Sequence, residues 1–170
     1  MVESPTRPWS SLSCFEATPS IQVSKCNNYG SSILFINVYF LEACHEKYEE
    51  YIMCLGILSF ILESHEEDYV CILGDFDATP GSWTFNEICD MLHENNVMFR
   101  DTDILPDNTY THLNNGSQTC SWLDHIAVSD FQFESTVDCR TVQDVACSDH
   151  CAITVTLNFD QLPITHTIAA

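Results

Sequence analysis

The stretch "VCILGDFDATPGSW", residues 70–83, carries the strongest structural and chemical signal in the chain. Its apolar run predicts a buried β-strand, which leads into Gly-Asp-Phe-Asp and then into a Pro-Gly turn. Because side chains alternate along a strand, we expect Asp75 and Asp77 to point to the same side. Two carboxylates on one face repel unless a cation, a proton or a hydrogen-bond donor lies between them. The stretch therefore predicts a polar site at the end of the strand.

The same residues also allow a purely structural interpretation. Asp77, Thr79 and Ser82 are all residue types that cap helix N-termini, and a helical pattern covers 82–95. A cap cluster and a chemical site are both consistent with this stretch, so the remainder of the chain decides between them.

The segments on either side predict an α/β fold. Runs of β-forming residues at 21–26 and 32–40 flank the turn residues NNYGS and predict a hairpin. Apolar residues between 43 and 64 recur at helical spacing. Short strands are predicted after the second helix, at 97–101, 109–113, 121–129, 133–139 and 151–159. This order of elements favours an α/β domain with a mixed, packed sheet.

The charge of the chain weighs against tight binding to nucleic acid. Its 170 residues suit one domain, and they include 25 acidic and only 5 basic residues, for a formal charge of −20. The basic residues are scattered along the sequence and form no patch. Phosphate backbones are bound mainly through Lys and Arg, which this chain largely lacks.

The cysteines indicate a reducing compartment. Ten cysteines occur singly, without any Cys-x-x-Cys pair, which argues against a zinc ribbon. The N-terminal sequence lacks the apolar core of a signal peptide, so we expect an intracellular protein, nuclear or cytoplasmic, that is not secreted. The longest apolar run, 52–62, has eleven residues and is too short to span a bilayer, so no membrane partner is expected.

Polar residues with catalytic potential also lie at other strand ends. Asp149 and His150 come just before the last predicted strand, and Asn37 and Tyr39 lie near the end of another. Asp124 lies within an apolar strand, where a carboxylate needs a partner. A histidine is a natural partner, because carboxylate–imidazole pairs fix the tautomer and orient the ring.

Four motifs in the chain resemble one known family. They are Asn-Val-Tyr ending at Tyr39, Gly-Asp-Phe-Asp ending at Asp77, "TYTHLNNGSQTCSWLDHI" with Asp124 as its acid, and Ser-Asp-His ending at His150. In this order and spacing, across residues 20–160, the chain resembles the endonuclease/exonuclease/phosphatase (DNase I-like) superfamily, above all the endonuclease domains of non-LTR retrotransposons.

The resemblance implies a two-sheet sandwich flanked by helices, with a phosphodiester-cleaving site. In this family pattern His150 would contact the scissile phosphate, with Asp124 holding its ring. Asp75 would orient or deprotonate the attacking water, and Tyr39 would donate a hydrogen bond to a phosphate oxygen. Asp149 would help to hold Mg²⁺ or Mn²⁺. The implied partner is DNA, although the charge of −20 opposes it.

One departure from the family pattern lies at Asp77, where the family has Asn. Asn can donate a hydrogen bond to a phosphate, whereas an ionised Asp cannot and adds a repelling charge. We therefore expect the substitution to impair catalysis.

A second departure lies at the N-terminus. The family has a metal-binding glutamate on a strand well before the Asn-x-Tyr strand, but only 36 residues precede Asn37. Glu16, in "LSCFEATPS", is one position early and is the candidate for this glutamate. The chain thus resembles the domain without its N-terminal strands. We expect a loose leader at 1–19, a partial domain at 20–160 and a tail at 161–170.

Three functional hypotheses follow from these observations. The first is a metal-dependent, endonuclease-like phosphodiesterase, impaired by truncation and by Asp77. The second is a non-catalytic, retroelement-derived binding or structural module. The third is a phosphoesterase that acts on a small or lipid phosphoester. For the enzyme we expect Asp75, Asp77, Asp124, Asp149 and His150 to converge at one end of the sheets. We expect His125, which follows Asp124 and so points to the opposite face, to be a surface or packing residue. No role is assigned to the remaining histidines, His45, His65, His93, His112 and His166.

Overall fold

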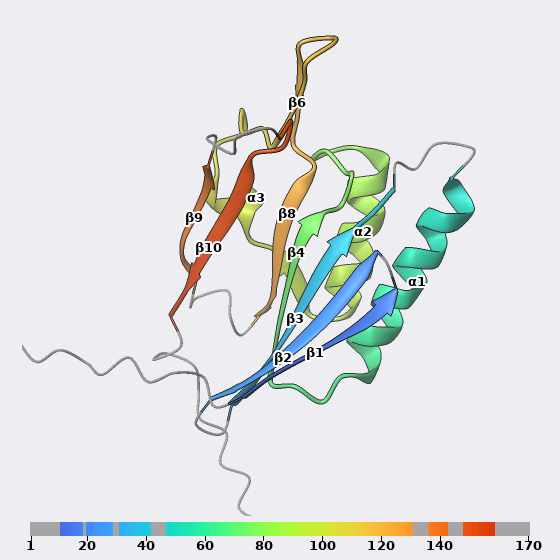
Figure 1. The fold of residues 1–170 in the computed structure, drawn as a ribbon, viewed down its shortest axis with the longest axis vertical. Helices are drawn as coiled ribbons and strands as arrows, with labels where there is room; N and C mark the ends of the chain where they lie inside the picture. Colours follow the sequence, from blue (N-terminus) through green and yellow to red (C-terminus); the bar gives the residue numbers. More distant parts are fainter. Residues whose placement is uncertain are drawn as a thin grey trace, which may run out of the picture.

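The computed structural model describes most of the chain, in segments 11–18, 20–28, 31–41, 47–130, 136–142 and 148–158. Within these residues it contains one six-stranded sheet, two two-stranded sheets and three helices (Figure 1). The predicted α/β class is confirmed.

The six-stranded sheet is mixed, and its spatial order is β1-β2-β3-β4-β8-β5. Only β3 and β4 pair in parallel, whereas the other neighbours pair antiparallel, including the predicted hairpin of β2 and β3. The strands are β1 (Ser11–Thr18), β2 (Ile21–Asn28), β3 (Ser31–Tyr39), β4 (Tyr69–Asp75), β8 (Asp124–Ser129) and β5 (Val97–Phe99).

Strand β1 corrects the expectation of a loose leader at 1–19. Ser11–Thr18 pairs antiparallel with β2 over nearly its whole length. The Ser- and Thr-rich composition around it suggested a leader. However, the outer edge of β2 has backbone donors and acceptors that a further strand can satisfy. Residues 1–10 lie outside the described segments.

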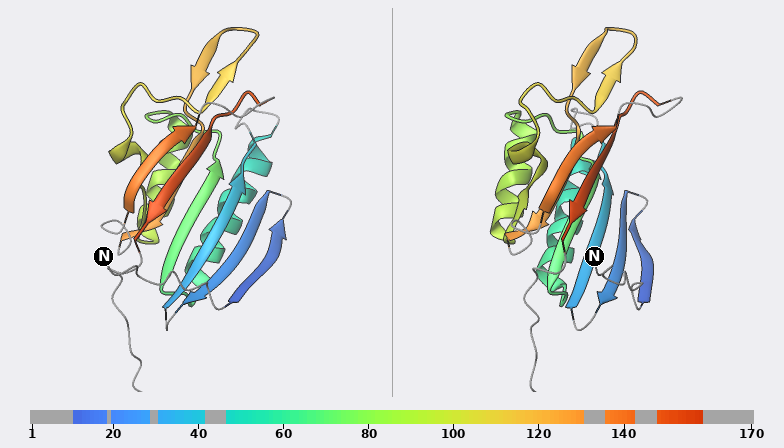
Figure 2. Two further views of the ribbon diagram at one scale, coloured as in Figure 1. Left: turned by 60° about the vertical axis from the view of Figure 1, so that its left-hand side comes forward. Right: turned by 90° about the vertical axis from the view of Figure 1, so that its left-hand side faces the viewer.

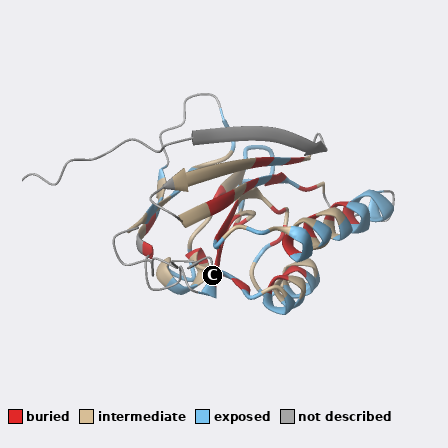
Figure 3. Cartoon of the chain, turned by 90° about the horizontal axis from the view of Figure 1, so that it is seen from below, coloured by how far each residue is buried: buried red, intermediate tan, exposed pale blue. Residues whose placement is uncertain are grey.

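Two long helices cover one face of this sheet. Helix α1 (Tyr48–Ser64) connects β3 to the parallel strand β4, and α2 (Trp83–Glu94) follows β4. Figure 3 shows that the buried residues of both helices lie on the side facing the sheet. The hydroxyl of Ser82 caps α2 by accepting a hydrogen bond from the backbone N–H of Phe85 at 3.1 Å, as the structural interpretation predicted. A third helix, α3 (Asp101–Ile104), is a single turn.

A second, smaller sheet covers part of the opposite face. Strands β9 (Thr136–Val142) and β10 (Ala152–Leu157) pair antiparallel and lie across β4 and β8 (Figure 2). Ile153 and Val155 of β10 pack there in one apolar cluster with Cys71 of β4. The predicted two layers of sheet are therefore present.

A hairpin projects beyond the end of the main sheet at which β4 finishes. It consists of β6 (His112–Asn114) and β7 (Thr119–Ser121), and Figures 1 and 2 show it standing above the carboxyl end of β4. His112 also forms an isolated antiparallel bridge with His150, just before β10. The hairpin and this segment therefore flank the end of β4.

Gly74 is the residue that allows β3 and β4 to pair where the strand ends. Its φ is +135°, and a Cβ at this position would lie 2.1 Å from the carbonyl oxygen of Val38 on β3. No other residue type fits here without displacing the backbone. Gly74 thus fixes the position of the carboxylate that follows it.

The described part of the chain contains no helix long and apolar enough to cross a membrane. The seven cysteines whose side chains the structure describes form no disulfide, and Cys54, Cys71 and Cys139 are buried in apolar surroundings. Burial raises the pKa of the Cys71 thiol to about 12, so this cysteine serves as an inert core residue.

Candidate active site

Three predicted site residues form a row across the ends of neighbouring strands. Tyr39 ends β3 and lies opposite Asp75, the last residue of β4, while Asp75 lies opposite Asp124, the first residue of β8. Residues directly opposite one another in a sheet project from the same face. Tyr39 is 57% exposed, whereas the carboxylates of Asp75 and Asp124 are only 16% and 15% exposed. The row therefore presents one accessible phenol beside two sheltered carboxylates.

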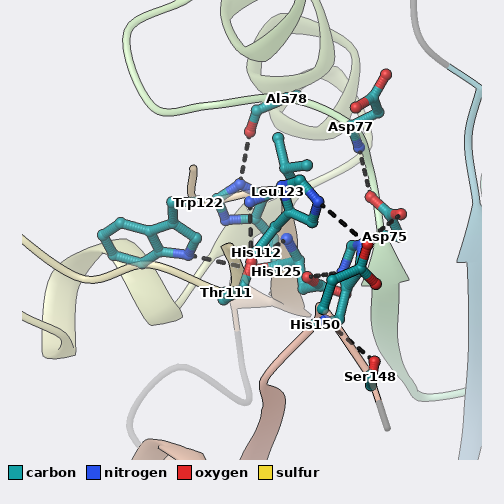
Figure 4. A network of polar contacts seen from close by, with 12 residues as sticks. Asp75, Asp77, Ala78, Thr111, His112, Trp122, Leu123, His125, Ser148 and His150 are labelled. Carbon is teal, nitrogen blue, oxygen red and sulfur yellow. Dashed lines mark hydrogen bonds and ion pairs between the residues drawn. The ribbon is translucent and has the colours of Figure 1, made fainter. Parts of the chain in front are cut away.

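His150 joins this row from the segment before β10. Its Nδ1 donates to Asp124 Oδ2 at 2.8 Å, and its Nε2 lies 4.0 Å from Asp75 Oδ2. The expected hydrogen bond between His150 and Asp124 is therefore confirmed. Figure 4 shows His150 lying beside Asp75 at the end of β4.

Backbone and side-chain hydrogen bonds hold Asp124 and His150 in place. The buried hydroxyl of Thr111 accepts from the backbone N–H groups of Leu123 and Asp124, both at 2.9 Å. The indole N–H of Trp122 donates to the Asp124 carbonyl at 3.1 Å. The Ser148 hydroxyl accepts from the backbone N–H of His150 at 3.0 Å. The serine of the Ser-Asp-His motif thus orients the turn that presents the imidazole.

The electrostatic surroundings shift the two central groups in the same direction. Partial burial lowers the pKa of His150. However, the hydrogen bond to Asp124 and the charges of Asp124, Asp75 and Asp149 outweigh it and raise the pKa above its usual 6.5. Burial also raises the pKa of the Asp75 carboxyl, with a further rise from Asp124, although the backbone N–H of Asp77 opposes both. A carboxylate with a raised pKa is a better proton acceptor near neutral pH.

Asp77 does not follow the predicted strand alternation. Strand β4 ends at Asp75, and Asp77 adopts a left-handed conformation with φ +49°. Its backbone N–H donates to Asp75 Oδ1 at 2.9 Å, while Figure 4 shows its carboxylate turned away from Asp75. The expectation that the two carboxylates point to the same side is therefore wrong. Asp and Asn tolerate this backbone conformation better than other non-glycine residues, which explains why an Asp or an Asn is suited to this position.

Asp149 lies at the outer edge of the site, next to a residue that received no role from the sequence. Its carboxylate is 59% exposed, and Oδ2 lies 3.6 Å from Nε2 of His112. The rings of His112 and His150 are 4.8 Å apart. His112 could not be assigned from the sequence because its neighbours are 37 and 38 residues away along the chain and reach it only through the β-bridge.

His125 is a buried structural residue on the other side of β8. It is completely buried, with Nδ1 2.7 Å from Asp101 Oδ2 and Nε2 2.7 Å from the carbonyl oxygen of Ala78. Both ring nitrogens therefore have a buried polar partner, which fixes the orientation of the ring. The sequence offered a surface or packing role, and the structure gives it a buried polar one. It ties the segment after Asp77 to β8 through Ala78 (Figure 4), and it ties β8 to α3 through Asp101.

Glu16, the second predicted metal ligand, cannot be placed at the site. Its backbone pairs with Gln22 in the β1–β2 ladder, but its side chain lies outside the described part of the structure. Its role stays a prediction.

Comparison with known proteins gives a structural likeness only. No protein-family model matches the chain, and no curated protein sequence matches it. Among solved structures, the 3′ phosphatase NExo from Neisseria, bound to a product DNA hairpin, aligns with TM-score 0.71 and 15% identity, over 89% of this chain and 72% of that one.

Two further structures have the same fold. The endonuclease domain of TRAS1, a telomere-specific non-LTR retrotransposon, aligns with TM-score 0.66 and 14% identity, over 88% of this chain and 70% of that one. An endonuclease/exonuclease/phosphatase family protein from Leptotrichia buccalis aligns with TM-score 0.63 and 15% identity, over 89% and 62%. The chain therefore has the DNase I-like fold of these proteins, as the motifs predicted, and spans 62–72% of their lengths.

Proposed function

We propose that this chain is a metal-dependent phosphodiesterase of the endonuclease type, with nucleic acid as its substrate. The observation that carries the proposal is the convergence of Asp75, Asp124 and His150 at the carboxyl end of β4, where His150 Nδ1 lies 2.8 Å from Asp124. The DNase I-like fold supports it, because structural neighbours include a DNA-bound phosphatase and a retrotransposon endonuclease domain.

Each residue of the site has a role that its surroundings suit. His150, whose pKa is raised by the neighbouring carboxylates, would bind and polarise the scissile phosphate, and Asp124 would orient its ring. Asp75, sheltered and with a raised pKa, would orient or deprotonate the attacking water. Tyr39, exposed at the end of the same row, would donate a hydrogen bond to a phosphate oxygen.

The carboxylates also fit a divalent metal. Mg²⁺ is usually held by one or two carboxylates together with waters and substrate phosphates. Asp149 is exposed enough to serve as such a ligand, and Asp75 Oδ2 lies 4.0 Å from Nε2 of His150. When bound, Mg²⁺ or Mn²⁺ would supply charge stabilisation at the phosphate. Glu16 would complete the set if its side chain reached the site.

Two alternatives remain, one suggested by the charge of −20 and one by Asp77 and the metal site. A strongly acidic protein repels a polyanion, so a small or lipid phosphoester would be a less hindered substrate. If Asp77 and an incomplete metal site abolish hydrolysis, the chain would instead be a non-catalytic, retroelement-derived binding or structural module.

The proposal can be tested by nicking of supercoiled plasmid DNA in Mg²⁺ or Mn²⁺. We expect conversion to the relaxed circle by the wild-type chain and none in chelator. His150→Ala should slow it by about 10²–10⁴-fold, the usual contribution of such a group. His93→Ala, at an exposed position in the last turn of α2, is the matched control and should cut at the wild-type rate. Nicking that survives His150→Ala would refute the assignment.

A further inference from the structure

His112 and His150 form a cross-strand pair that the proposed reaction does not use as a pair. The backbone N–H of Leu113 donates to the Asp149 carbonyl, and that of Cys151 donates to the Thr111 carbonyl. The hydrogen bonds therefore lie on either side of the His112–His150 bridge rather than within it. In an antiparallel ladder, such a non-hydrogen-bonded pair brings its side chains closest together.

The two imidazoles and one carboxylate share a small volume. One ligand atom from each of His112, Asp149 and His150 lies within 4.8 Å of the others, and His112 Nε2 is 3.6 Å from Asp149 Oδ2. Two ligand atoms of a tetrahedral Zn²⁺ ion, each about 2.0–2.1 Å from the metal, are about 3.4 Å apart. Only a small closing movement would bring the three atoms to this spacing.

The surroundings of His150 suit a metal-binding imidazole. Its Nδ1–H donates to Asp124, so Nε2 is the nitrogen left for a ligand. A carboxylate that holds the second nitrogen is the common outer-shell arrangement of metal-bound histidine. Asp75 lies 4.0 Å from Nε2 and offers a fourth ligand, and the side chains of His112 and His150 are 20% and 31% exposed, so an ion can enter from solvent.

We propose that His112, Asp149 and His150 form a binding site for a late first-row divalent ion of the Zn²⁺ class. Imidazole nitrogen favours such ions, whereas Mg²⁺ prefers oxygen ligands. This site differs from the Mg²⁺ site because it requires His112. A consequence that rests on the proposed function is inhibition, because an ion on His150 Nε2 withdraws that nitrogen from the phosphate.

The test is a titration of the whole reduced chain with ZnCl₂ by calorimetry, in excess Mg²⁺. Cysteine thiolates can also bind Zn²⁺, so the decisive quantity is the difference between variants. We expect His112→Phe to lose one equivalent of Zn²⁺, or to bind it at least about tenfold more weakly. His93→Phe should keep the wild-type stoichiometry.

A second variant and probe guard against a folding defect. His112→Asn should give the same loss, and circular dichroism should show both variants folded. Titration with CoCl₂ separates ligand types, because thiolate ligands give charge-transfer bands that imidazole and carboxylate ligands lack. Equal Zn²⁺ stoichiometry and affinity in wild type, His112→Phe and His112→Asn would overturn the site.

The binding result does not depend on catalysis. Loss of a Zn²⁺ equivalent in His112→Phe, in a wild-type chain that cuts no phosphodiester, would support the metal site while the proposed function fails. Mg²⁺-dependent cleavage without that loss would support the function and overturn the metal site.

Discussion

At the scale of single residues, the site depends on what surrounds His150. Asp124, Asp75 and Asp149 lie close enough to raise the pKa of its imidazole above 6.5, against the effect of partial burial. An imidazolium at neutral pH can bind a phosphate oxygen as a charged donor, which a neutral ring does less strongly. The protonation of His150 is therefore the property through which the acidic cluster would serve catalysis.

This property gives a prediction about Asp124. Asp124→Asn removes the charge and the carboxylate acceptor from Nδ1, so the pKa of His150 should fall. An NMR titration of the imidazole signals measures this directly. The stabilisation of the folded chain by this pair is fully present below about pH 6.5, the unfolded value, and is lost as the pH rises through the higher folded value. An unchanged His150 pKa in Asp124→Asn would contradict the account.

Asp77 gives the second prediction at this scale. Asp77→Asn keeps the left-handed conformation, removes one negative charge and supplies an amide donor. If this donor reaches the phosphate, hydrolysis should rise by up to about two to three decades, the usual worth of one such donor. The double variant with His150→Ala should return to background. A slower Asp77→Asn enzyme would mean that the Asp77 carboxylate itself takes part in the reaction.

The sequence predicted some of these residues and missed others for physical reasons. Asp124 was expected within an apolar strand, where a carboxylate needs a partner; it is instead the first residue of β8, and His150 is its partner. His112 gave no local signal, because its companions come from a distant segment. The predicted orientation of the Asp77 side chain was wrong, because strand alternation does not predict the left-handed conformation that follows the strand.

At the scale of elements, the close pairing of β3 and β4 sets the position of Asp75. Gly74→Ala should destabilise the fold, because the new Cβ would meet the Val38 carbonyl oxygen and the φ of +135° is strained for any other residue. We expect a loss of about 1–3 kcal/mol or more in the free energy of unfolding, measured by urea denaturation.

A matched substitution at another glycine should change the free energy of unfolding in the opposite direction. Gly56 lies in the middle of α1 with nothing within 4 Å of an added Cβ. Gly56→Ala should stabilise by about 0.5–1 kcal/mol, since alanine is the better helix former. Equal effects of the two substitutions would mean that the β3–β4 contact does not constrain Gly74.

Most elements were predictable because each repeats a strong local pattern. The continuous apolar run of β4 and the capped periodicity of α2 needed no tertiary information. Strand β1 was missed because its Ser- and Thr-rich sequence becomes a strand only through pairing with β2. Helix α1 lies on the sheet through Tyr51, Cys54 and Leu58, although apolar side chains such as Met53 and Phe60 also lie on its exposed side.

At the scale of the whole molecule, charge and fold favour different conclusions. The DNase I-like fold is found in proteins that act on DNA, whereas a charge of −20 repels the phosphate backbone. We predict that duplex DNA binds no more tightly than about 10⁻⁶ M at physiological salt, the tight end of ordinary non-specific binding. Gel-shift assays in chelator check this, and nanomolar, salt-steep binding would contradict it.

The central claim is that the Asp75–Asp124–His150 cluster hydrolyses phosphodiesters with a divalent metal. The most direct measurement is the rate of nitrophenolate release from bis(p-nitrophenyl) phosphate in Mg²⁺, because this small diester avoids the repulsion between DNA and an acidic surface. We predict metal-dependent turnover by the wild-type chain. His150→Ala should lower the rate by about 10²–10⁴-fold, whereas His93→Ala should keep the wild-type rate. Turnover equal in wild type and His150→Ala, or no turnover above buffer in any metal, would contradict the claim.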